Sequence, residues 1–297
     1  MNYKKSFFLM GTNIEIIINS EINIEKEIYE AFGIFYSYEL EFSRFLKNST
    51  LSLLNQNKTL EVSSRFLDVF NLCKEIYNIT NGFFNPLINL SNIGYSSNFE
   101  DNNFSKTSIL NNLNMDEIKI EGNFINLLQD QNLDFGGIVK GYCVDIVAEY
   151  LLEKGCKDFI INAGGDIYTS GNNNGKKWII GIDNPFIPDT LIGSIELENK
   201  SISTSGSYKR NWKIKGNNYH HIINPNNYSS CENEIISLSL ISQKTYITDT
   251  YATACFNMGI EKSLKFLERN NIDSLIIGTD SKMYTSKGFN NYNFLIF

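Results

Sequence analysis

The chain has 297 residues and a mass of 34.0 kDa, enough for one large domain or two average ones with a buried core. Its hydrophobic share of 42% and charged share of 20% are those of a folded globular protein, and they exclude a disordered or collagen-like chain. Acidic residues outnumber basic ones by 33 to 26, so the net charge is -7 and the chain lacks the basic excess that attracts a phosphate backbone. We therefore expect no nucleic-acid partner.

The cysteines and the N-terminal segment bear on the cellular compartment. Five cysteines, an odd number without C-x-x-C spacing, predict reduced and mostly buried thiols rather than a disulfide framework or a zinc site. The first residues hold too few apolar side chains for a signal-peptide core, and no run approaches the roughly 20 apolar residues of a membrane span. We expect a cytoplasmic protein with no membrane span. The cysteines are Cys73, Cys143, Cys156, Cys231 and Cys255.

Hydrophobic periodicity mixes strands and helices from the start of the chain. Alternating isoleucines predict a strand over 12–19, and apolar residues at helical spacing predict helices around 28–36 and 66–77. The Asn- and Ser-rich segment 89–107 predicts a long exposed loop. A helix over 138–154 ends before a glycine, as a C-terminal glycine stop predicts.

The second half of the chain continues this mixture. We expect strands at 159–162, 178–182, 191–197, 235–241, 274–277 and 292–297, and helices at 248–258 and 261–270. This order fits an α+β architecture better than a regular βαβ alternation. We expect one domain spanning residues 1–297, either undivided or as two closely packed lobes.

Two glycine turns are candidates for ligand binding. Segment 133–142 places Asp134, a glycine pair and Lys140 at the opening of a helix, where free N–H groups can meet an anion or merely follow a tight turn. Segment 162–166 ends a strand with Gly-Gly-Asp, and Asp166 either binds a ligand or caps the turn. On the residues alone, a plain turn is the favoured interpretation of both segments.

Two further segments carry chemical groups. Asp249 and Thr253 lie four residues apart, hence on one helix face, where their oxygens suit Mg²⁺ or serve only to cap and bond back to the helix. The adjacent pair His220 and His221 contains both histidines of the chain. Neighbouring residues of a strand face opposite ways, so only one of them can point into a given site, as a general base or as a structural hydrogen-bonding group.

Taken in order, these segments resemble the ApbE family, the FAD:protein FMN transferases. The resemblance covers nearly the whole chain, from about residue 10 to 277. The matching segments are 10–12, 41–45, 48–55, 80–86, 134–142, 162–166, 204–208, 221–225 and 249–253 with Gly259.

The resemblance implies an ApbE-like flavin transferase fold, with mixed sheets and packed helices in one large globular unit. It implies an enzyme that uses Mg²⁺ and FAD, transfers FMN to a Thr or Ser hydroxyl of an acceptor flavoprotein through a phosphoester bond, and releases AMP. Two alternatives stay open: a Mg²⁺-dependent FAD pyrophosphatase that gives FMN and AMP, and a non-catalytic flavin-binding protein.

The resemblance also assigns roles to single residues. Asp249, Thr253 and the backbone carbonyl of Gly137 are the implied metal ligands, and His221 and Asp249 are the implied catalytic residues, with His221 as the base for the acceptor hydroxyl. The implied FAD site is lined by Met10, Phe45, Phe83, Phe84, Asn85, Asp134, Lys140 and Ile223.

Three asparagines depart from the family pattern. Asn81, Asn85 and Asn224 stand where the family usually has Asp. Each exchange keeps the shape of the side chain and removes a negative charge, so hydrogen bonds can survive while the site becomes less acidic. Gly137 replaces a frequent Ala, which matters less because the implied ligand there is a backbone oxygen.

Overall fold

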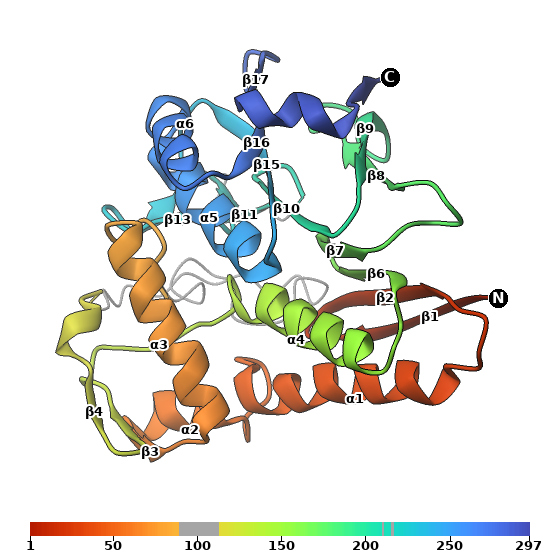
Figure 1. Ribbon diagram of the computed structural model, residues 1–297. Coiled ribbons are helices and arrows are strands. Elements are labelled where there is room, and N and C mark those ends of the chain that lie inside the picture. The colour runs from red at the N-terminus through yellow and green to blue at the C-terminus, as the bar shows by residue number, and fades with distance from the viewer. Residues whose placement is uncertain (89–112, 210, 215–216) are drawn as a thin grey trace.

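The computed structural model describes residues 1–88, 113–209, 211–214 and 217–297 (Figure 1). The predicted loop 89–107 lies outside the described residues. All five cysteines are free and buried, and their burial agrees with the prediction of mostly buried thiols. In the described part of the chain, no helix is both long and apolar enough to cross a membrane.

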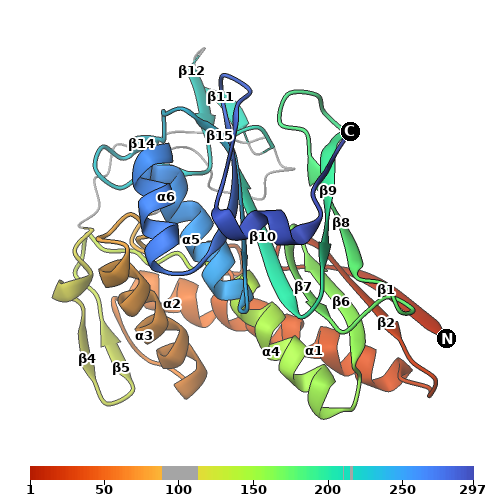
Figure 2. The same ribbon diagram turned by 45° about the horizontal axis from the view of Figure 1, so that its top comes forward.

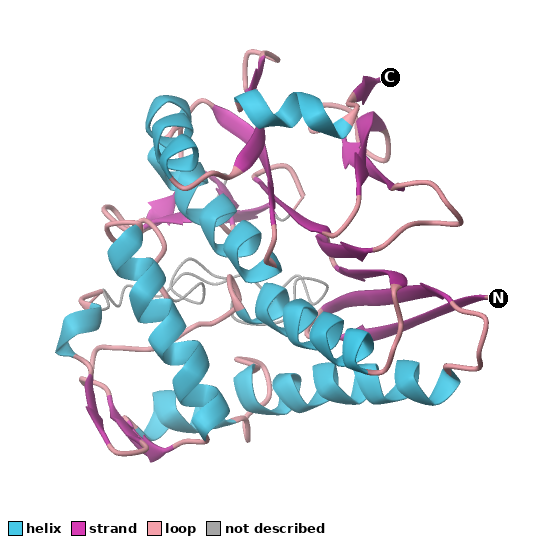
Figure 3. Cartoon of the chain, in the orientation of Figure 1, coloured by secondary structure: helices cyan, strands magenta, loops and turns pink. Residues whose placement is uncertain are grey.

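An antiparallel sheet runs through the centre of the described structure (Figures 1 and 3). Each strand pairs antiparallel with its neighbours, so helices and strands are not arranged as βαβ units and the α+β prediction is confirmed. The strands in spatial order are β1 (Asn2–Leu9), β2 (Thr12–Asn19), β6 (Asp158–Ala163), β7 (Asp166–Ser170), β10 (Lys200–Gly206), β15 (Ile235–Ser242), β16 (Asp273–Gly278) and β17 (Met283–Thr285).

Helices cover one face of this sheet and bury the larger of two hydrophobic cores. They are α1 (Glu25–Phe42), α4 (Val139–Glu153) and α5 (Thr245–Met258), with α6 (Ile260–Arg269) beside α5. The opposite face carries a smaller core under a three-stranded sheet and a 3-10 helix, Lys287–Tyr292. That small sheet consists of β18 (Leu295–Ile296), β9 (Leu191–Leu197) and β8 (Trp178–Asp183).

Strand β16 shows why the sheet has two cores. Leu275 and Ile277 lie in the smaller core, whereas Ile276 between them lies in the larger one. Successive side chains of a strand point to opposite faces, so a continuous apolar run is buried when both faces are covered.

The remaining elements surround the helical face. Figure 2 shows α2 (Thr50–Asn57) and α3 (Ser64–Ile79) at the side away from β8 and β9. Both helices begin at serine caps, Ser49 and Ser63, whose hydroxyls accept backbone N–H bonds from the first turn. The small elements are β3 (Thr59–Glu61), β4 (Lys119–Glu121), β5 (Phe124–Asn126), the 3-10 turn Met115–Glu117, and the hairpins β11 (Asn211–Ile214) with β12 (Asn217–His220) and β13 (Ile223–Asn224) with β14 (Ser229–Ser230).

The predicted strand 292–297 is wrong for most of its length. The chain leaves the 3-10 helix at Tyr292, turns at Asn293 with φ 49°, and pairs only Leu295–Ile296 with β9. Phe289 and Tyr292 lie one 3-10 turn apart and both enter the smaller core, where the Tyr292 hydroxyl donates to Asp273. This burial fixes a helical turn where the apolar residues alone predicted an extended chain.

Strands β1 and β10 were not predicted. Strand β1 has no buried residue, and its polar and apolar side chains do not alternate regularly, so pairing with β2 defines it. Strand β10 has the sequence KSISTSG, and two of its serines, Ser201 and Ser203, are buried with hydrogen-bond partners. The Ser203 hydroxyl lies 2.9 Å from that of Thr248 on α5, and Ser201 donates to the Ser242 carbonyl.

Helices α4 and α5 cross closely at Gly141. A Cβ atom there would lie 2.7 Å from the Thr245 carbonyl oxygen and 2.9 Å from the Asp249 Cβ. The backbone N–H of Gly141 donates to Asp249 Oδ2 at 3.3 Å, so the same crossing places a buried carboxylate. Only a glycine at position 141 lets the two helices approach this far.

We expect Gly141→Ala to destabilise the fold by about 1–3 kcal/mol, because the added methyl meets backbone that cannot yield. The matched control is Gly33→Ala in α1, an exposed helical position where a Cβ meets nothing within 4 Å. That exchange should stabilise by about 0.5–1 kcal/mol through the helix propensity of alanine. Urea unfolding of both variants measures the two free energies. If both exchanges change the free energy of unfolding by the same amount, α4 and α5 do not approach as closely at Gly141 as the structure shows.

Candidate functional site

A cavity of about 1040 Å³ opens where the β1–β2 turn, the end of α1, the start of α4, strand β8 and helix α5 come together. All the residues that the family resemblance nominated line it, although they come from segments spread over the whole chain. They are Met10, Phe45, Phe83, Phe84, Asn85, Asp134, Gly137, Lys140, His221, Ile223, Asp249 and Thr253.

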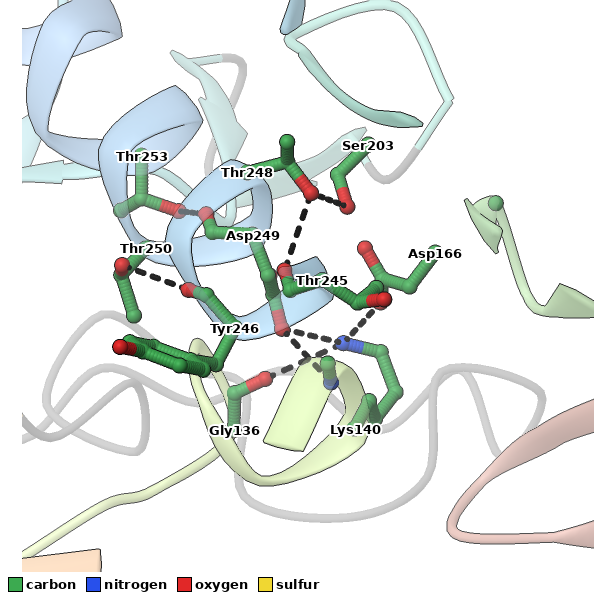
Figure 4. A network of polar contacts seen from close by, with 12 residues as sticks. Gly136, Lys140, Asp166, Ser203, Thr245, Tyr246, Thr248, Asp249, Thr250 and Thr253 are labelled. Atoms are coloured by element: carbon green, nitrogen blue, oxygen red, sulfur yellow. Dashed lines mark hydrogen bonds and ion pairs between the residues drawn. The ribbon is translucent and has the colours of Figure 1, made fainter. Parts of the chain in front are cut away.

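A lysine shared by two carboxylates lies at one wall of this cavity (Figure 4). Lys140 Nζ is 3.0 Å from Asp166 Oδ2 and 3.6 Å from Asp249 Oδ2, and it donates to the Gly136 carbonyl at 3.3 Å. The three charged side chains are 9–14% exposed. With both carboxyl groups ionised, this cluster has a net charge of -1 and is largely shielded from water.

The surroundings of Asp249 raise the pKa of its carboxyl group. Burial raises the pKa of this carboxyl above its ordinary value, and the charge of Asp166 raises it further. The Lys140 ammonium and the Gly141 N–H act in the opposite direction, because both stabilise the carboxylate. The Asp249 carboxylate therefore has too little positive charge around it, and a bound cation would supply more.

Asp166 does not cap its turn. The side chain of Asn162 accepts the Gly165 N–H at 2.9 Å and caps the Gly-Gly turn instead. The Asp166 carboxylate points away from the turn toward Lys140. The sequence favoured a plain turn for this segment, whereas the structure places a buried charge at the cavity.

The Gly-Gly turn also packs against the first hairpin. Gly164 has φ 68°, and a Cβ on it would lie 2.2 Å from the Thr12 hydroxyl. The hairpin turn itself uses positive φ at Met10 and Gly11, and the Met10 N–H donates to Glu39 on α1. Two glycine motifs that are distant in sequence thus form one rim of the cavity.

The implied metal ligands lie next to one another. A Cβ on Gly137 would be 3.9 Å from Thr253 Oγ1, and Thr253 lies one helical turn beyond Asp249 on α5. The Thr253 hydroxyl also donates to the Asp249 carbonyl at 3.4 Å, which is the back-bonding that the spacing equally predicted.

The donors of this site are all oxygens. Among the described residues no three His, Cys, Asp or Glu side chains gather into a metal cluster, so a metal here would need hydroxyl and carbonyl oxygens as well. A carboxylate, a hydroxyl and a backbone carbonyl are hard donors of the type that Mg²⁺ accepts while keeping waters or substrate phosphate oxygens. The residues present therefore fit Mg²⁺ better than a softer metal.

Asp134 fixes the loop that leads into α4. Its carboxylate receives Arg44 Nη1 at 2.9 Å and the Gly136 N–H at 2.8 Å. The Arg44 guanidinium lies over the Phe45 ring, 4.6 Å from its centroid. This arrangement joins the end of α1 to the glycine loop and leaves a cationic and an aromatic side chain at the cavity.

The structure separates the two histidines. His220 accepts the Ile222 N–H at Nδ1 (3.3 Å) and pairs through Nε2 with the Cys231 carbonyl (2.8 Å), which requires the neutral ring with the proton on Nε2. Burial lowers the pKa of His220, in agreement with that neutral form. His220 therefore holds the loop, whereas His221 lines the cavity.

The three asparagines each have a local structural reason. Asn81 adopts φ 50°, the left-handed conformation that Asn tolerates best among residues with a Cβ. Asn85 Nδ2 donates to the Leu113 carbonyl while its Oδ1 accepts the Leu87 N–H, so a carboxylate would lose the first bond. Asn224 Oδ1 accepts the Asn226 N–H, a bond that Asp makes equally well.

Comparison with known proteins agrees with this geometry. The family model described as the ApbE family matches residues 10–276. The chain belongs to the ApbE family. The resemblance deduced from the ordered motifs is therefore confirmed.

Curated relatives and a solved structure give the extent of the similarity. A FAD:protein FMN transferase of Vibrio cholerae is 29% identical over 266 residues, covering 84% of this chain and 79% of that one. One of Klebsiella pneumoniae is 35% identical over 147 residues, which span 49% of this chain and about half, 45%, of the relative. The crystal structure of the ApbE protein of Thermotoga maritima superposes with a TM-score of 0.89 at 23% identity, covering 98% and 99% of the two chains. The ApbE fold predicted from the resemblance is confirmed.

Sequence reasoning missed three residues of the site. For Asp166 the sequence favours a turn role over a ligand role, and Arg44 belongs to a matching segment without an assigned role. Asn257, one turn beyond Thr253, donates to the carbonyls of Phe83 and Ile223 and ties two cavity segments to α5. A buried polar residue at helical spacing from Asp249 and Thr253 was the available signal for Asn257.

Asp145 on α4 provides a pH-dependent test of how α5 is held. Its carboxylate accepts the N–H groups of Thr245 (2.8 Å) and Tyr246 (3.0 Å) at the start of α5, and burial raises its pKa to about 6. Because the folded pKa lies above the unfolded value, its contribution to stability is complete below about pH 4 and is lost as the pH rises to about 6.

We expect wild type to lose about 2–3 kcal/mol of unfolding free energy relative to Asp145→Asn between about pH 4 and pH 6.5, because the variant cannot ionise. Urea unfolding at several pH values measures this difference, and the other carboxyl groups cancel in the comparison. If the difference in unfolding free energy between wild type and Asp145→Asn does not change with pH, Asp145 titrates in the folded protein as it does in the unfolded chain.

The exchange Asn85→Asp should cost about 1–3 kcal/mol at neutral pH, because a buried carboxylate would face the Leu113 carbonyl without a proton to donate. The cost should shrink at low pH, where the protonated acid can donate. Asn224→Asp is the matched control and should stay within about 0.5 kcal/mol of wild type. Thermal unfolding at two pH values tests both, and an equal cost at both sites would contradict the assigned bonds.

Proposed function

We propose that the protein transfers FMN from FAD to a Ser or Thr hydroxyl of an acceptor flavoprotein, with Mg²⁺ as cofactor and AMP as the leaving product. The proposal is supported by membership of the ApbE family and by relatives named FAD:protein FMN transferase. The observation that carries it for this chain is the cluster of Asp249, Thr253 and Gly137 beside Lys140 at one cavity wall.

The cavity suits a large phosphate-containing ligand. Its volume of about 1040 Å³ is at the upper end of the range for small-molecule sites, about 300–1,000 Å³. Phosphate oxygens would lie near the Lys140 ammonium, which lines the cavity from the first turn of α4. Phe45 and Phe83 offer flat apolar surfaces for a ring system, and Arg44 adds a second cation.

In the proposed reaction the acceptor hydroxyl oxygen attacks the FMN phosphorus of FAD. A new P–O bond forms to the acceptor, the P–O bond to AMP breaks, and the hydroxyl proton passes to the His221 ring. Asp249, Thr253 and the Gly137 carbonyl would hold Mg²⁺, which when bound would neutralise charge on the pyrophosphate oxygens. Asp134 and Arg44 orient the glycine loop on which Gly137 lies.

The test is to incubate the protein with FAD, Mg²⁺ and a flavoprotein acceptor domain, and to measure AMP and acceptor-bound flavin fluorescence. We expect both products together, and a loss of about 100-fold or more in Asp249→Ala, since metal-ion stabilisation amounts to several kcal/mol. Asp280→Ala, an exposed carboxylate paired with Lys282, is the control and should retain the rate.

The other outcomes identify the alternatives. AMP and FMN formed at the same rate without acceptor would indicate a Mg²⁺-dependent FAD pyrophosphatase. FAD bound tightly without either product, with several acceptors tried, would indicate a non-catalytic flavin-binding protein. Either result would refute the transferase proposal.

A further inference from the structure

The Lys140 ammonium lies unequally between its two carboxylates. It is 3.0 Å from Asp166 Oδ2 and 3.6 Å from Asp249 Oδ2. Lys140 projects from the first turn of α4, and Asp166 is the first residue of β7, where it pairs with Ala163 in the sheet. Both backbones are fixed by regular structure, whereas the lysine stem has four flexible carbons.

The ammonium lies close to the carboxylate that is the implied metal ligand, Asp249. Mg²⁺ binds a carboxylate oxygen at about 2.0–2.1 Å. One oxygen of the Asp249 carboxylate, Oδ2, already has Lys140 Nζ at 3.6 Å and accepts the Gly141 N–H at 3.3 Å. A divalent cation on Asp249 would repel the ammonium and so favour its displacement toward Asp166.

We propose that Lys140 is the resident counter-ion of Asp249 in the metal-free protein, and that Asp166 retains the ammonium when a divalent cation binds Asp249. Lys140 thus competes with the metal, and Asp166 is a positioning residue that relieves the competition. The inference rests on the metal site of the proposed function.

The charges make this exchange favourable at the buried site. Without metal and with both carboxyl groups ionised, the cluster of Lys140, Asp166 and Asp249 has a net charge of -1, which burial makes costly unless the charges are paired. With a divalent cation on Asp249, Lys140 needs a carboxylate of its own, and Asp166 is already its nearer partner. The Gly136 carbonyl, at 3.3 Å, gives the ammonium a second acceptor on the same side.

The test is a double-mutant cycle on metal affinity in the absence of FAD and acceptor. Mn²⁺ binding is measured by electron paramagnetic resonance for wild type, Lys140→Gln, Asp166→Asn and the double variant, with circular dichroism to confirm folding. We expect Lys140→Gln to tighten binding about tenfold, because the competitor is gone, and Asp166→Asn to weaken it about tenfold, because Lys140 moves fully onto Asp249.

The decisive quantity is the coupling between the two exchanges. In the Lys140→Gln background, Asp166→Asn should change the affinity by less than about threefold, since no ammonium remains to be held. If Asp166→Asn weakens Mn²⁺ binding as much in the Lys140→Gln background as in wild type, the proposal is overturned. Asp166 would then act as a direct ligand or by its charge alone. Unchanged affinity in Lys140→Gln, or no Mn²⁺ binding by that variant, would also overturn it.

Two controls separate this effect from general charge and from folding. Lys265→Gln removes the same charge from an exposed lysine paired with Glu261 and should leave Mn²⁺ affinity unchanged. Lys140→Arg keeps the charge and should bind Mn²⁺ no more tightly than wild type. The Mn²⁺ titrations contain neither FAD nor acceptor, so they do not depend on transfer activity. Loss of the coupling would refute the counter-ion proposal, whereas loss of FMN transfer would refute the proposed function.

Discussion

The close crossing of α4 and α5 at Gly141 is the contact on which the site depends. It brings a backbone N–H within hydrogen-bond distance of Asp249, and one turn further along α4 it places Asp145 under the N–H groups that begin α5. The start of α5 has no cap from its own chain neighbours, so a carboxylate from the other helix satisfies it. The same crossing therefore fixes where α5 begins and where its carboxylate lies.

The cavity is formed by the antiparallel sheet together with the crossing helices. One face packs against α1, α4 and α5, and the other carries the small sheet with β8, so both faces of the central strands are buried. The cavity is lined by residues from the β1–β2 turn, the β6–β7 turn and β8, as well as the helix ends. The charged side chains at its wall are paired: Lys140 with Asp166 and Asp249, and Arg44 with Asp134.

Local signals in the sequence predicted much of the fold. Isoleucine alternation gave β2, and the glycine stop gave the end of α4. Polar strands escaped detection, because the serines of β10 are buried through hydrogen bonds to α5 and β15 that no periodicity reveals. The C-terminal strand was mistaken because burial of Phe289 and Tyr292, not residue type, decides its conformation.

The sequence by itself determined the family, the order of the motifs and the candidate residues, because glycine turns and charged residues at fixed spacings are local properties. Only the tertiary structure decided that Asp166 faces Lys140 instead of capping its turn, and that His220 is structural while His221 lines the cavity. These assignments depend on which distant segment supplies the partner. A carboxylate or an imidazole acquires its role from the charge and burial around it, and those are set by helix crossing and strand order rather than by neighbours in the chain.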